Sequence, residues 1–354
     1  MTSSDIKGGR ILIVTDAWHP QVNGVVRTLS KLAEVLAEMG VEAKFLTPER
    51  FRSFPMPFYP DIRLALATPR QVAREITETA PDFIHIATEG PLGQLARRAC
   101  RRQGVVFTTS YHTKFPEYLS ARLPISESWT YARLRDFHNS GQGVMVATAS
   151  LGEDLSRRGF NNIRQWTRGV DAQLFNPGRR GKIDLPGPIF LCVGRVAVEK
   201  NLPAFLDLDL PGSKVVVGDG PELPTLKKRY PGAHFLGALP NEDLARVYAA
   251  SDVFVFPSRT DTFGNVLLEA MASGCPVAAF PVTGPIDIVG PGGVVAEDLR
   301  DAAMLALDVS REAARANALN YSWPSCTRQF LTHLRPARSE LGRAEIGDTF
   351  AVAP

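Results

Sequence analysis

The sequence lacks any long hydrophobic run. No segment approaches the roughly 18 apolar residues that a transmembrane helix needs. The first ten residues, MTSSDIKGGR, contain no hydrophobic core of a signal peptide. Hydrophobic residues make up 44% of the chain and charged residues 22%, which is ordinary for a globular protein. These features predict a cytoplasmic protein.

Cysteine is also scarce, and the four cysteines are scattered singly: Cys100, Cys192, Cys275 and Cys326. Their spacing matches neither a disulfide framework nor a pair of metal ligands. One Asp-x-Asp pair, Asp207 and Asp209, has the residue types that bind a metal-bound diphosphate. Because the pair lies at a predicted helix end before Pro211, we interpret it as a surface pair and predict no metal site.

A strong charge of one sign is absent, since the net charge is only +3. The two halves differ, however: residues 1–170 hold 22 Lys and Arg against 16 Asp and Glu, and the remainder holds 18 against 21. A basic half can attract nucleic acid or an anionic membrane. No nucleic-acid motif is visible, so no nucleic-acid partner is expected.

The chain of 354 residues suggests two domains, and strands alternate with helices along most of it. In the first half we predict strands at 10–15, 41–47, 83–87, 105–110 and 143–148, with helices at 25–39, 69–80, 90–103 and 127–140. Residues 50–60, with three prolines and four aromatics, are predicted to form a loop. This alternation predicts a parallel, doubly wound sheet.

A second alternating series follows a linker at 178–188, which is rich in Gly, Pro and charge. The predicted strands are 189–193, 214–217, 233–236, 252–256, 275–280 and 294–295, and the predicted helices include 241–250 and 299–308. A helical region extends to about residue 334, and residues 335–354 are expected to form a loosely held tail. The sequence therefore predicts two similar α/β halves.

Residues 258–274 (SRTDTFGNVLLEAMASG) predict a loop and then a helix that ends at Gly274. Helical spacing gathers a polar stripe on one side, consisting of Thr262, Asn265, Glu269 and Ser273. Two interpretations are open at this point. Either the stripe is solvated and Asp261 is an N-cap, or Asp261 and Glu269 flank a ligand site at the carboxyl end of a strand.

Two cations favour the ligand site. Arg195 and Lys200 follow the first strand of the second half and suit a doubly charged oxygen ligand such as a diphosphate. Glu269 can accept two hydrogen bonds from the vicinal diol of a ribose, because an ionised carboxylate only accepts. Diphosphate and ribose together indicate a nucleotide, and Asp261 could then contact what the diphosphate carries. A sugar nucleotide fits this layout.

The first half offers three further candidates. The loop at 16–24 precedes a helix whose first N–H groups could face a phosphate, although an ordinary loop is equally compatible. His112 follows a strand and could donate or accept a hydrogen bond. The predicted helix at 90–103 carries four arginines on one side: Arg97, Arg98, Arg101 and Arg102. We favour a solvated outer face there, and contact with an anionic surface stays open.

Several motifs in combination resemble the GT-B glycosyltransferases of family 4. They are the early PQVNGV loop, GR-x4-K at 194–200, GDGP at 218–221, and D-x7-E at 261–269 with FG and LEAMASG. The resemblance covers roughly residues 10–335. It implies two Rossmann-like, doubly wound domains facing across a cleft. We place an acceptor-binding domain at 1–172, a donor-binding domain at 173–320, and a helix crossing back plus a tail at 321–354.

The resemblance also implies roles for single residues. Arg195 and Lys200 would neutralise the donor diphosphate, Glu269 would hold the ribose, and Asp261 and His112 would face the transferred sugar. The remaining donor contacts would come from Gly24, Gly218, Gly264, Asn265 and Val266. Two departures stand out. Asp261 replaces the Glu that is commoner in the family, and Thr283-Gly-Pro-Ile-Asp287 replaces a Gly-Gly-x-Pro-Glu turn.

The implied reaction is hexose transfer from a UDP- or GDP-linked sugar with retention, without a metal or other cofactor. A membrane lipid such as diacylglycerol is the expected acceptor, with the protein peripheral on the inner face of the cell membrane. Polysaccharide and small-molecule acceptors stay open, and so does the oligomeric state. A hydrolase using Asp261 and Glu269 is less favoured, because neighbouring cations are expected to keep both carboxylates ionised. A sugar-nucleotide epimerase or a binding module of similar fold is a further alternative.

Overall fold

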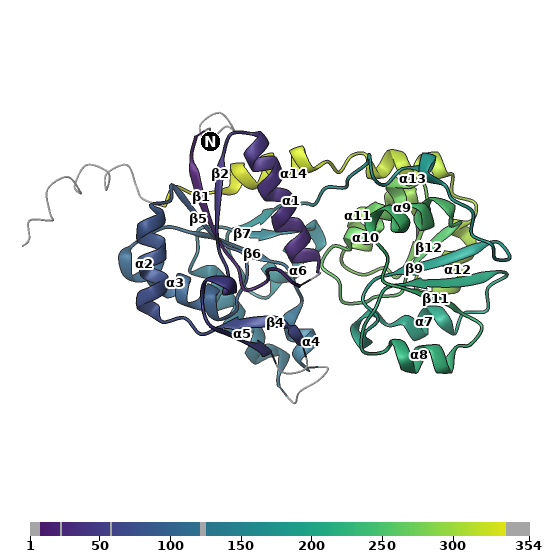
Figure 1. Cartoon of the computed structure of the whole chain (residues 1–354), viewed down its shortest axis with the longest axis horizontal. Coiled ribbons are helices and arrows are strands. Elements are labelled where there is room, and N and C mark those ends of the chain that lie inside the picture. The colour runs from purple at the N-terminus through teal and green to yellow at the C-terminus, as the bar shows by residue number, and fades with distance from the viewer. Residues whose placement is uncertain (1–7, 22, 57–58, 121–124, 338–354) are drawn as a thin grey trace, which may run out of the picture.

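A computed structural model describes residues 8–21, 23–56, 59–120 and 125–337. The described chain forms two lobes, and each lobe is built around a six-stranded parallel sheet (Figure 1). The predicted pair of α/β halves is thus confirmed. Within the described residues, no helix is both long enough and apolar enough to cross a bilayer.

The N-terminal sheet has the strand order β2-β1-β5-β6-β7-β8. Its strands are β1 (Arg10–Val14), β2 (Glu42–Leu46), β5 (Phe83–Ile86), β6 (Thr108–Tyr111), β7 (Val144–Val146) and β8 (Ile163–Gln165). The helices of this lobe are α1 (Gly24–Glu38), α2 (Pro69–Thr79), α3 (Pro91–Gln103), α4 (Phe115–Ser120), α5 (Glu127–Asn139) and α6 (Ala149–Arg157). The central strands are buried on both faces, as near-continuous apolar runs require. The short strand β8 was not predicted.

The C-terminal sheet repeats the arrangement with the order β11-β10-β9-β12-β13-β14. Its strands are β9 (Ile189–Val193), β10 (Ser213–Val217), β11 (His234–Gly237), β12 (Val253–Phe256), β13 (Val277–Ala279) and β14 (Gly293–Val295). Its helices are α7 (Leu202–Leu206), α8 (Leu223–Arg229), α9 (Asn241–Ala250), α10 (Asn265–Ala272), α11 (Pro285–Ile288), α12 (Leu299–Ala306) and α13 (Arg311–Ala318). The described residues also include four single 3-10 turns: Pro48–Arg50 in the N-terminal lobe, and Pro177–Arg179, Val198–Lys200 and Gly290–Gly292 further along the chain.

Helix α14 (Trp323–His333) follows the second lobe in sequence but packs beside α1 of the first (Figure 1). Phe330 and Leu331 are buried in one cluster with Ile11 and Leu29. The chain enters this helix through a β-bridge between Val170 and Ser322. The domain boundaries at 172 and 320 stay predictions.

Two predictions for irregular segments were wrong. Residues 50–60 were expected to be a loop, but strands β3 (Ser53–Met56) and β4 (Tyr59–Ala65) form an antiparallel hairpin. A two-stranded ribbon has outer edges that need no hydrogen-bond partner, so it tolerates prolines that an inner strand would exclude. Residues 335–337 are also held: Pro336 bridges to Phe83, and Ala337 is 2% exposed. The rest of the predicted tail, 338–354, lies outside the described residues.

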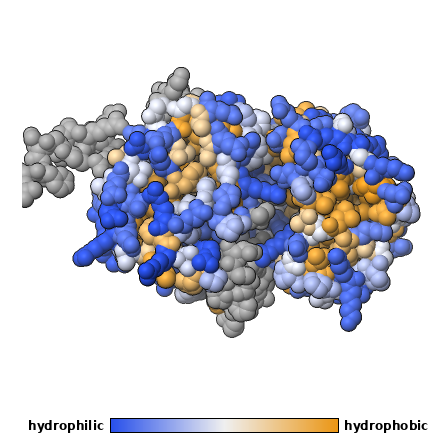
Figure 2. Space-filling model, viewed as in Figure 1, coloured by the Kyte–Doolittle hydropathy of each residue, from blue (hydrophilic) through white to orange (hydrophobic). Residues whose placement is uncertain are grey.

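Side chains of the two lobes contact each other along their shared boundary. Thr262 Oγ1 donates to the His112 carbonyl at 2.6 Å. Ser150 N donates to Asp287 Oδ1 at 2.9 Å, and Lys114 Nζ donates to Thr283 Oγ1 at 3.2 Å. On the face shown in Figure 2, this interlobe boundary is mainly hydrophilic. The carboxyl ends of β6 and β12 therefore face one another across it.

Candidate active site

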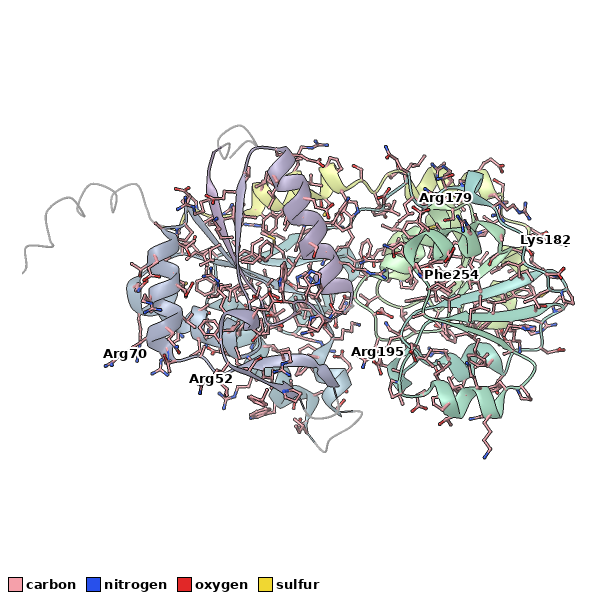
Figure 3. All side chains as sticks on the ribbon, viewed as in Figure 1. Arg52, Arg70, Arg179, Lys182, Arg195 and Phe254 are labelled. Atoms are coloured by element: carbon pink, nitrogen blue, oxygen red, sulfur yellow. The ribbon has the colours of Figure 1, made fainter. Side chains whose placement is uncertain are left out.

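The carboxyl ends of β9 and β12 form a small pocket lined by residues that include Arg195 and Lys200. Arg195 is exposed and lies on the side of its lobe that faces the N-terminal lobe (Figure 3). Gly218, after β10, has a φ of +140°, and a Cβ atom there would lie 1.8 Å from the Gly194 carbonyl oxygen. Only glycine therefore lets these two loops approach so closely.

Lys200 is bound by Asp261. Its Nζ atom donates to Asp261 Oδ1 at 2.6 Å and to Oδ2 at 2.8 Å, and the two side chains are 24% and 16% exposed. The N-cap of the following helix is Gly264, so the interpretation of Asp261 as an N-cap was wrong. Lys200 was predicted to bind the diphosphate and Asp261 to contact the sugar, and the structure joins the two residues in one ion pair. An incoming anion would therefore compete with Asp261 for Lys200.

Helix α10 positions Glu269. Its N-cap is Gly264, whose φ of +88° favours glycine, and the following helix is buried from Leu267 to Ala272. Glu269 is 8% exposed, and Ser273 is fully buried. The interpretation of this polar stripe as a solvated face was therefore wrong. Asn265 begins the helix at the interlobe boundary and Val266 packs on the core of the C-terminal lobe.

Two of the described residues contact the carboxylate of Glu269. Tyr248 donates its hydroxyl to Oε2 at 3.1 Å, and Arg27 of α1 lies 3.5 Å from Oε1. Burial raises the pKa of Glu269, while Arg27 and the Tyr248 hydrogen bond oppose the rise. We had expected neighbouring cations to favour its ionised form; Arg27 acts in that direction, and burial acts against it. Tyr248 and Arg27 were both missed, although Arg27 follows Gly24 by only three positions.

The loop after β1 faces the start of α10. A Cβ atom on Gly24 would lie 3.7 Å from Asn265 Nδ2, so the two predicted donor contacts approach each other from opposite lobes. Asn23 caps α1 by accepting from Val25 N and Val26 N, both at 3.0 Å. The expectation of free N–H groups in this first turn was thus wrong for those two residues, because the cap satisfies them.

Asp16, another residue that the sequence did not single out, anchors this loop. Its buried carboxylate accepts from Leu92 N at 2.8 Å and from the Thr88 hydroxyl at 2.9 Å. Burial raises its pKa, and these hydrogen bonds act in the opposite direction. The first turn of α3 is therefore tied to the loop that carries Gly24.

His112 follows β6, and its ring contacts Arg168 of the N-terminal lobe. Arg168 Nη2 lies 3.0 Å from His112 Nδ1. The His112 Nε2 atom is buried and has no hydrogen-bond partner among the described residues. Burial, and secondly the charge of Arg168, hold the pKa of His112 well below its ordinary value. His112 is thus a neutral side chain at the interlobe boundary.

The altered turn at 283–287 makes a contact between lobes. Gly284 has a φ of +95° and begins α11, and Asp287 accepts hydrogen bonds from the Ser150 backbone N–H and hydroxyl. Asp287 therefore holds α11 against α6. This use of the carboxylate was not predicted.

The Asp-x-Asp pair at 207–209 does not belong to any metal cluster among the described residues. Among the described residues, no group of three or more His, Cys, Asp or Glu side chains could hold a metal ion. Asp207 and Asp209 are exposed, and Asp207 accepts from the Tyr230 hydroxyl at 2.7 Å. Their interpretation as a surface pair is confirmed.

The arginines of α3 divide into two kinds. Arg97 pairs with Asp136 of α5 at 2.6 Å and donates to the Ser140 hydroxyl. The other three are exposed, form no ion pair with any described residue, and border an open hollow; we call Arg98, Arg101 and Arg102 the arginine face. At about 1.5 Å per residue, they lie about 10–16 Å along α3 from its start beside Asp16.

Comparison with known proteins shows to which family the chain belongs. A model described as glycosyltransferase family 4 matches residues 22–174, and a model described as glycosyl transferases group 1 matches residues 187–312. A GDP-mannose-dependent alpha-mannosyltransferase of Mycobacterium tuberculosis is 32% identical over 368 residues, which cover 94% of this chain and 97% of that protein. The chain belongs to glycosyltransferase family 4. It is accordingly an enzyme, a glycosyltransferase that uses a nucleotide sugar.

Two further similarities are relevant to this glycosyltransferase. An alpha-monoglucosyldiacylglycerol synthase of Streptococcus pneumoniae is 26% identical, with 76% of this chain and 70% of that protein covered. The solved sucrose-phosphate synthase from Thermosynechococcus elongatus superposes with a TM-score of 0.71 at 20% identity, covering 92% of this chain and 98% of that one. At this identity the second similarity shows the fold alone, and it confirms the predicted GT-B architecture.

Proposed function

We propose that this glycosyltransferase moves a hexose from a UDP- or GDP-linked sugar to the hydroxyl of a membrane lipid such as diacylglycerol, with retention at the anomeric carbon. The observation that carries the donor half is the grouping of Arg195, the Lys200–Asp261 pair and Glu269 on elements that follow β9 and β12. Two cations suit a diphosphate, and a buried carboxylate suits the ribose diol.

The proposed chemistry is electrostatic. The bond between the anomeric carbon and the diphosphate oxygen breaks, and its electron pair stays on the diphosphate. Arg195 and Lys200 stabilise the charge that develops there, which is the charge a metal ion would otherwise balance. A new bond forms from the acceptor oxygen to the same face of the carbon, and the acceptor proton passes to a diphosphate oxygen. No metal is needed in this scheme, so we expect activity to persist in a chelator.

His112 and Asp261 are proposed to face the transferred hexose. The His112 ring has a buried Nε2 atom without a partner among the described residues, and Thr262 beside Asp261 contacts the His112 carbonyl. Both residues thus come from loops that meet at the interlobe boundary. The mannosyltransferase relative covers nearly the full chain and favours GDP-mannose among the candidate donors.

The lipid acceptor is proposed on two grounds. One relative is named a glucosyldiacylglycerol synthase. The arginine face offers three exposed cations on the lobe expected to bind the acceptor, and such clusters attract anionic lipid surfaces. Peripheral attachment to the inner face of the cell membrane would follow. It would bring the lipid hydroxyl to the lobe opposite the donor.

A thermal-shift panel of UDP-, GDP- and ADP-sugars tests the donor. A ligand at a hundred times its dissociation constant adds about 2.7 kcal/mol to the free energy of unfolding. We expect one base to stabilise the wild type and to lose its effect in Arg195→Ala. No shift with any nucleotide would refute the donor site. Conversion of the donor sugar without an acceptor would instead indicate an epimerase, and its hydrolysis without an acceptor would indicate a hydrolase.

A further inference from the structure

Arg168 is a buried arginine that is only 4% exposed. Among the described residues it forms no ion pair with a carboxylate. Its Nη1 atom donates to the Trp166 and Thr167 carbonyls at 2.7 and 2.9 Å, and its guanidinium carbon lies 4.5 Å from the centre of the Trp166 ring. Two backbone carbonyls and an aromatic face therefore fix the orientation of this cation. Its other terminal nitrogen, Nη2, is directed to His112.

This contact determines which ring nitrogen of His112 carries the proton. A guanidinium group has only N–H donors and no acceptor. The 3.0 Å contact with Arg168 Nη2 therefore requires an unprotonated Nδ1 on His112 that accepts the hydrogen bond. In a neutral ring the proton then resides on Nε2. That N–H is buried and has no partner among the described residues, which is costly unless a ligand accepts it.

We propose that Arg168 is a positioning residue, which holds His112 as the neutral Nε2–H tautomer so that this N–H donates to an oxygen of the transferred hexose. The inference rests on the proposed function for the identity of the ligand. The tautomer itself is inferred from the protein without a ligand. Arg168 does not touch the substrate in this scheme and acts through His112.

Other ionisable groups near His112 support a neutral ring. His85 of β5 hydrogen-bonds to the Thr108 and Ser110 hydroxyls, and burial lowers its pKa to about 3. His138 of α5 contacts the Thr109 hydroxyl and Glu89. Arg168 supplies the nearest charge, and it disfavours a second positive charge on His112. His112 is thus a fixed donor and not a proton shuttle.

The tautomer can be read directly in the wild-type protein by nitrogen-15 NMR of its histidines. Protonated and unprotonated ring nitrogens resonate in different regions, and His112→Gln identifies the signals of His112. We expect a protonated Nε2 and an unprotonated Nδ1 throughout about pH 5–8, without titration. A protonated Nδ1, or titration near the ordinary histidine pKa, would overturn the proposal. This readout needs no folded Arg168 variant and no activity.

Variants then test the consequence. Arg168→Lys keeps a cationic donor and should preserve the tautomer, whereas Arg168→Met should let His112 titrate at a higher pH. With a nucleotide sugar, the Met variant should lose about five- to tenfold in kcat/KM, the cost of about one hydrogen bond. Binding of the nucleoside diphosphate alone should be unchanged, because it lacks the hexose. In a His112→Gln background, changing Arg168 to Lys or Met should have no further effect on kcat/KM.

Arg311→Met is the matched control. Arg311 also donates to backbone carbonyls, including that of Ser251 at 2.8 Å, but it lies in the C-terminal lobe on α13. Its loss should lower stability without changing the His112 signals. If the tautomer is as expected but no nucleotide sugar binds, the proposed function fails and the Arg168–His112 relationship survives. If Arg168→Met leaves the His112 signals unchanged, the positioning role is wrong.

Discussion

Arg27 and Glu269 meet across the interlobe boundary, with Arg27 Nη1 3.5 Å from Glu269 Oε1. The Arg27 side chain is 45% exposed and the Glu269 side chain is 10% exposed. Tyr248 holds the other carboxylate oxygen at 3.1 Å. A ribose diol brings two hydrogen-bond donors to the carboxylate of Glu269. It would replace the contact with Arg27, which is longer and more exposed than the contact with Tyr248. In the free enzyme, Glu269, which is proposed to bind the ribose, is thus partly occupied by Arg27 of the N-terminal lobe.

Arg27→Met should therefore tighten the binding of a nucleoside diphosphate. An exposed ion pair contributes about 0–1 kcal/mol, so the dissociation constant should fall by up to about fivefold. Isothermal titration calorimetry measures this change. Lys31→Met is the control, because Lys31 lies on the same helix and pairs with Glu34 within one lobe. Weaker binding in Arg27→Met would show instead that Arg27 contacts the donor.

Glu269→Gln should separate binding from stability. Losing the charged acceptor for the ribose costs about 1.5–3 kcal/mol, or about ten- to a hundredfold in nucleotide affinity. The same change should not destabilise the free protein at neutral pH. Because folding raises the pKa of Glu269, its contribution to stability is present below its unfolded pKa and is lost as the pH rises through its folded pKa.

Denaturant unfolding at several pH values checks the second half of this prediction. The free energy of unfolding of Glu269→Gln, relative to wild type, should increase as the pH rises and level off above the folded pKa of Glu269. A relative stability that falls with rising pH would contradict the direction assigned here. Unchanged nucleotide affinity in Glu269→Gln would remove Glu269 from the donor site.

The fold was largely predictable, because it depends on local patterns. Continuous apolar strands and amphipathic helices were recognised along both lobes, and the clearest error, the hairpin β3–β4, came from a segment rich in proline. Such composition normally excludes a strand, and the structure tolerates it because the ribbon pairs only with itself. The helix α10 was predicted correctly, but its polar stripe could not be classed as buried or solvated from the sequence. The partners of Glu269, Tyr248 and Arg27, lie far away in the chain.

The site was predictable only in part, for a related reason. Arg195, Lys200 and Glu269 belong to motifs whose residues lie close in sequence. Glu269 and Arg27 are 242 positions apart, and Arg168 and His112 are 56 apart, so neither contact leaves a periodic signal. The burial that raises the pKa of Glu269 could not be predicted for the same reason, because burial is a property of the packed molecule.

Asp261→Asn should weaken the competition for Lys200. The Lys200 ammonium group now donates to both oxygens of Asp261, and replacing the carboxylate removes an anion that an incoming diphosphate would have to displace. We expect tighter binding of a nucleoside diphosphate, by about fivefold for each 1 kcal/mol gained. If Asp261 also contacts the hexose, kcat with the nucleotide sugar should fall at the same time. Titration calorimetry and steady-state kinetics measure the two effects.

The control for this pair is Asp243→Asn, which removes an exposed carboxylate that pairs with Arg246 on α9. It should change neither affinity nor kcat. Equal losses of diphosphate affinity and turnover in Asp261→Asn would mean that Asp261 is needed to orient Lys200, and competition between Asp261 and the diphosphate would be excluded.

The arginine face should determine attachment to anionic membranes. Replacing Arg98, Arg101 and Arg102 together by glutamine removes three cations that have no acidic partner among the described residues. Each basic residue near an anionic surface contributes about 1 kcal/mol, so binding should weaken by up to about a hundredfold. Cosedimentation with vesicles of anionic lipid at low salt measures this.

The matched control for the arginine face is the triple glutamine variant of Lys227, Lys228 and Arg229, which makes the same change in net charge on α8 of the C-terminal lobe. Its binding should remain close to wild type, because the lobe expected to bind the donor need not touch the bilayer. Equal losses in both variants would mean that vesicles sense only net charge. Strong wild-type binding that survives high salt would also count against the arginine face, since screening shortens electrostatic attraction to about 3 Å in 1 M salt.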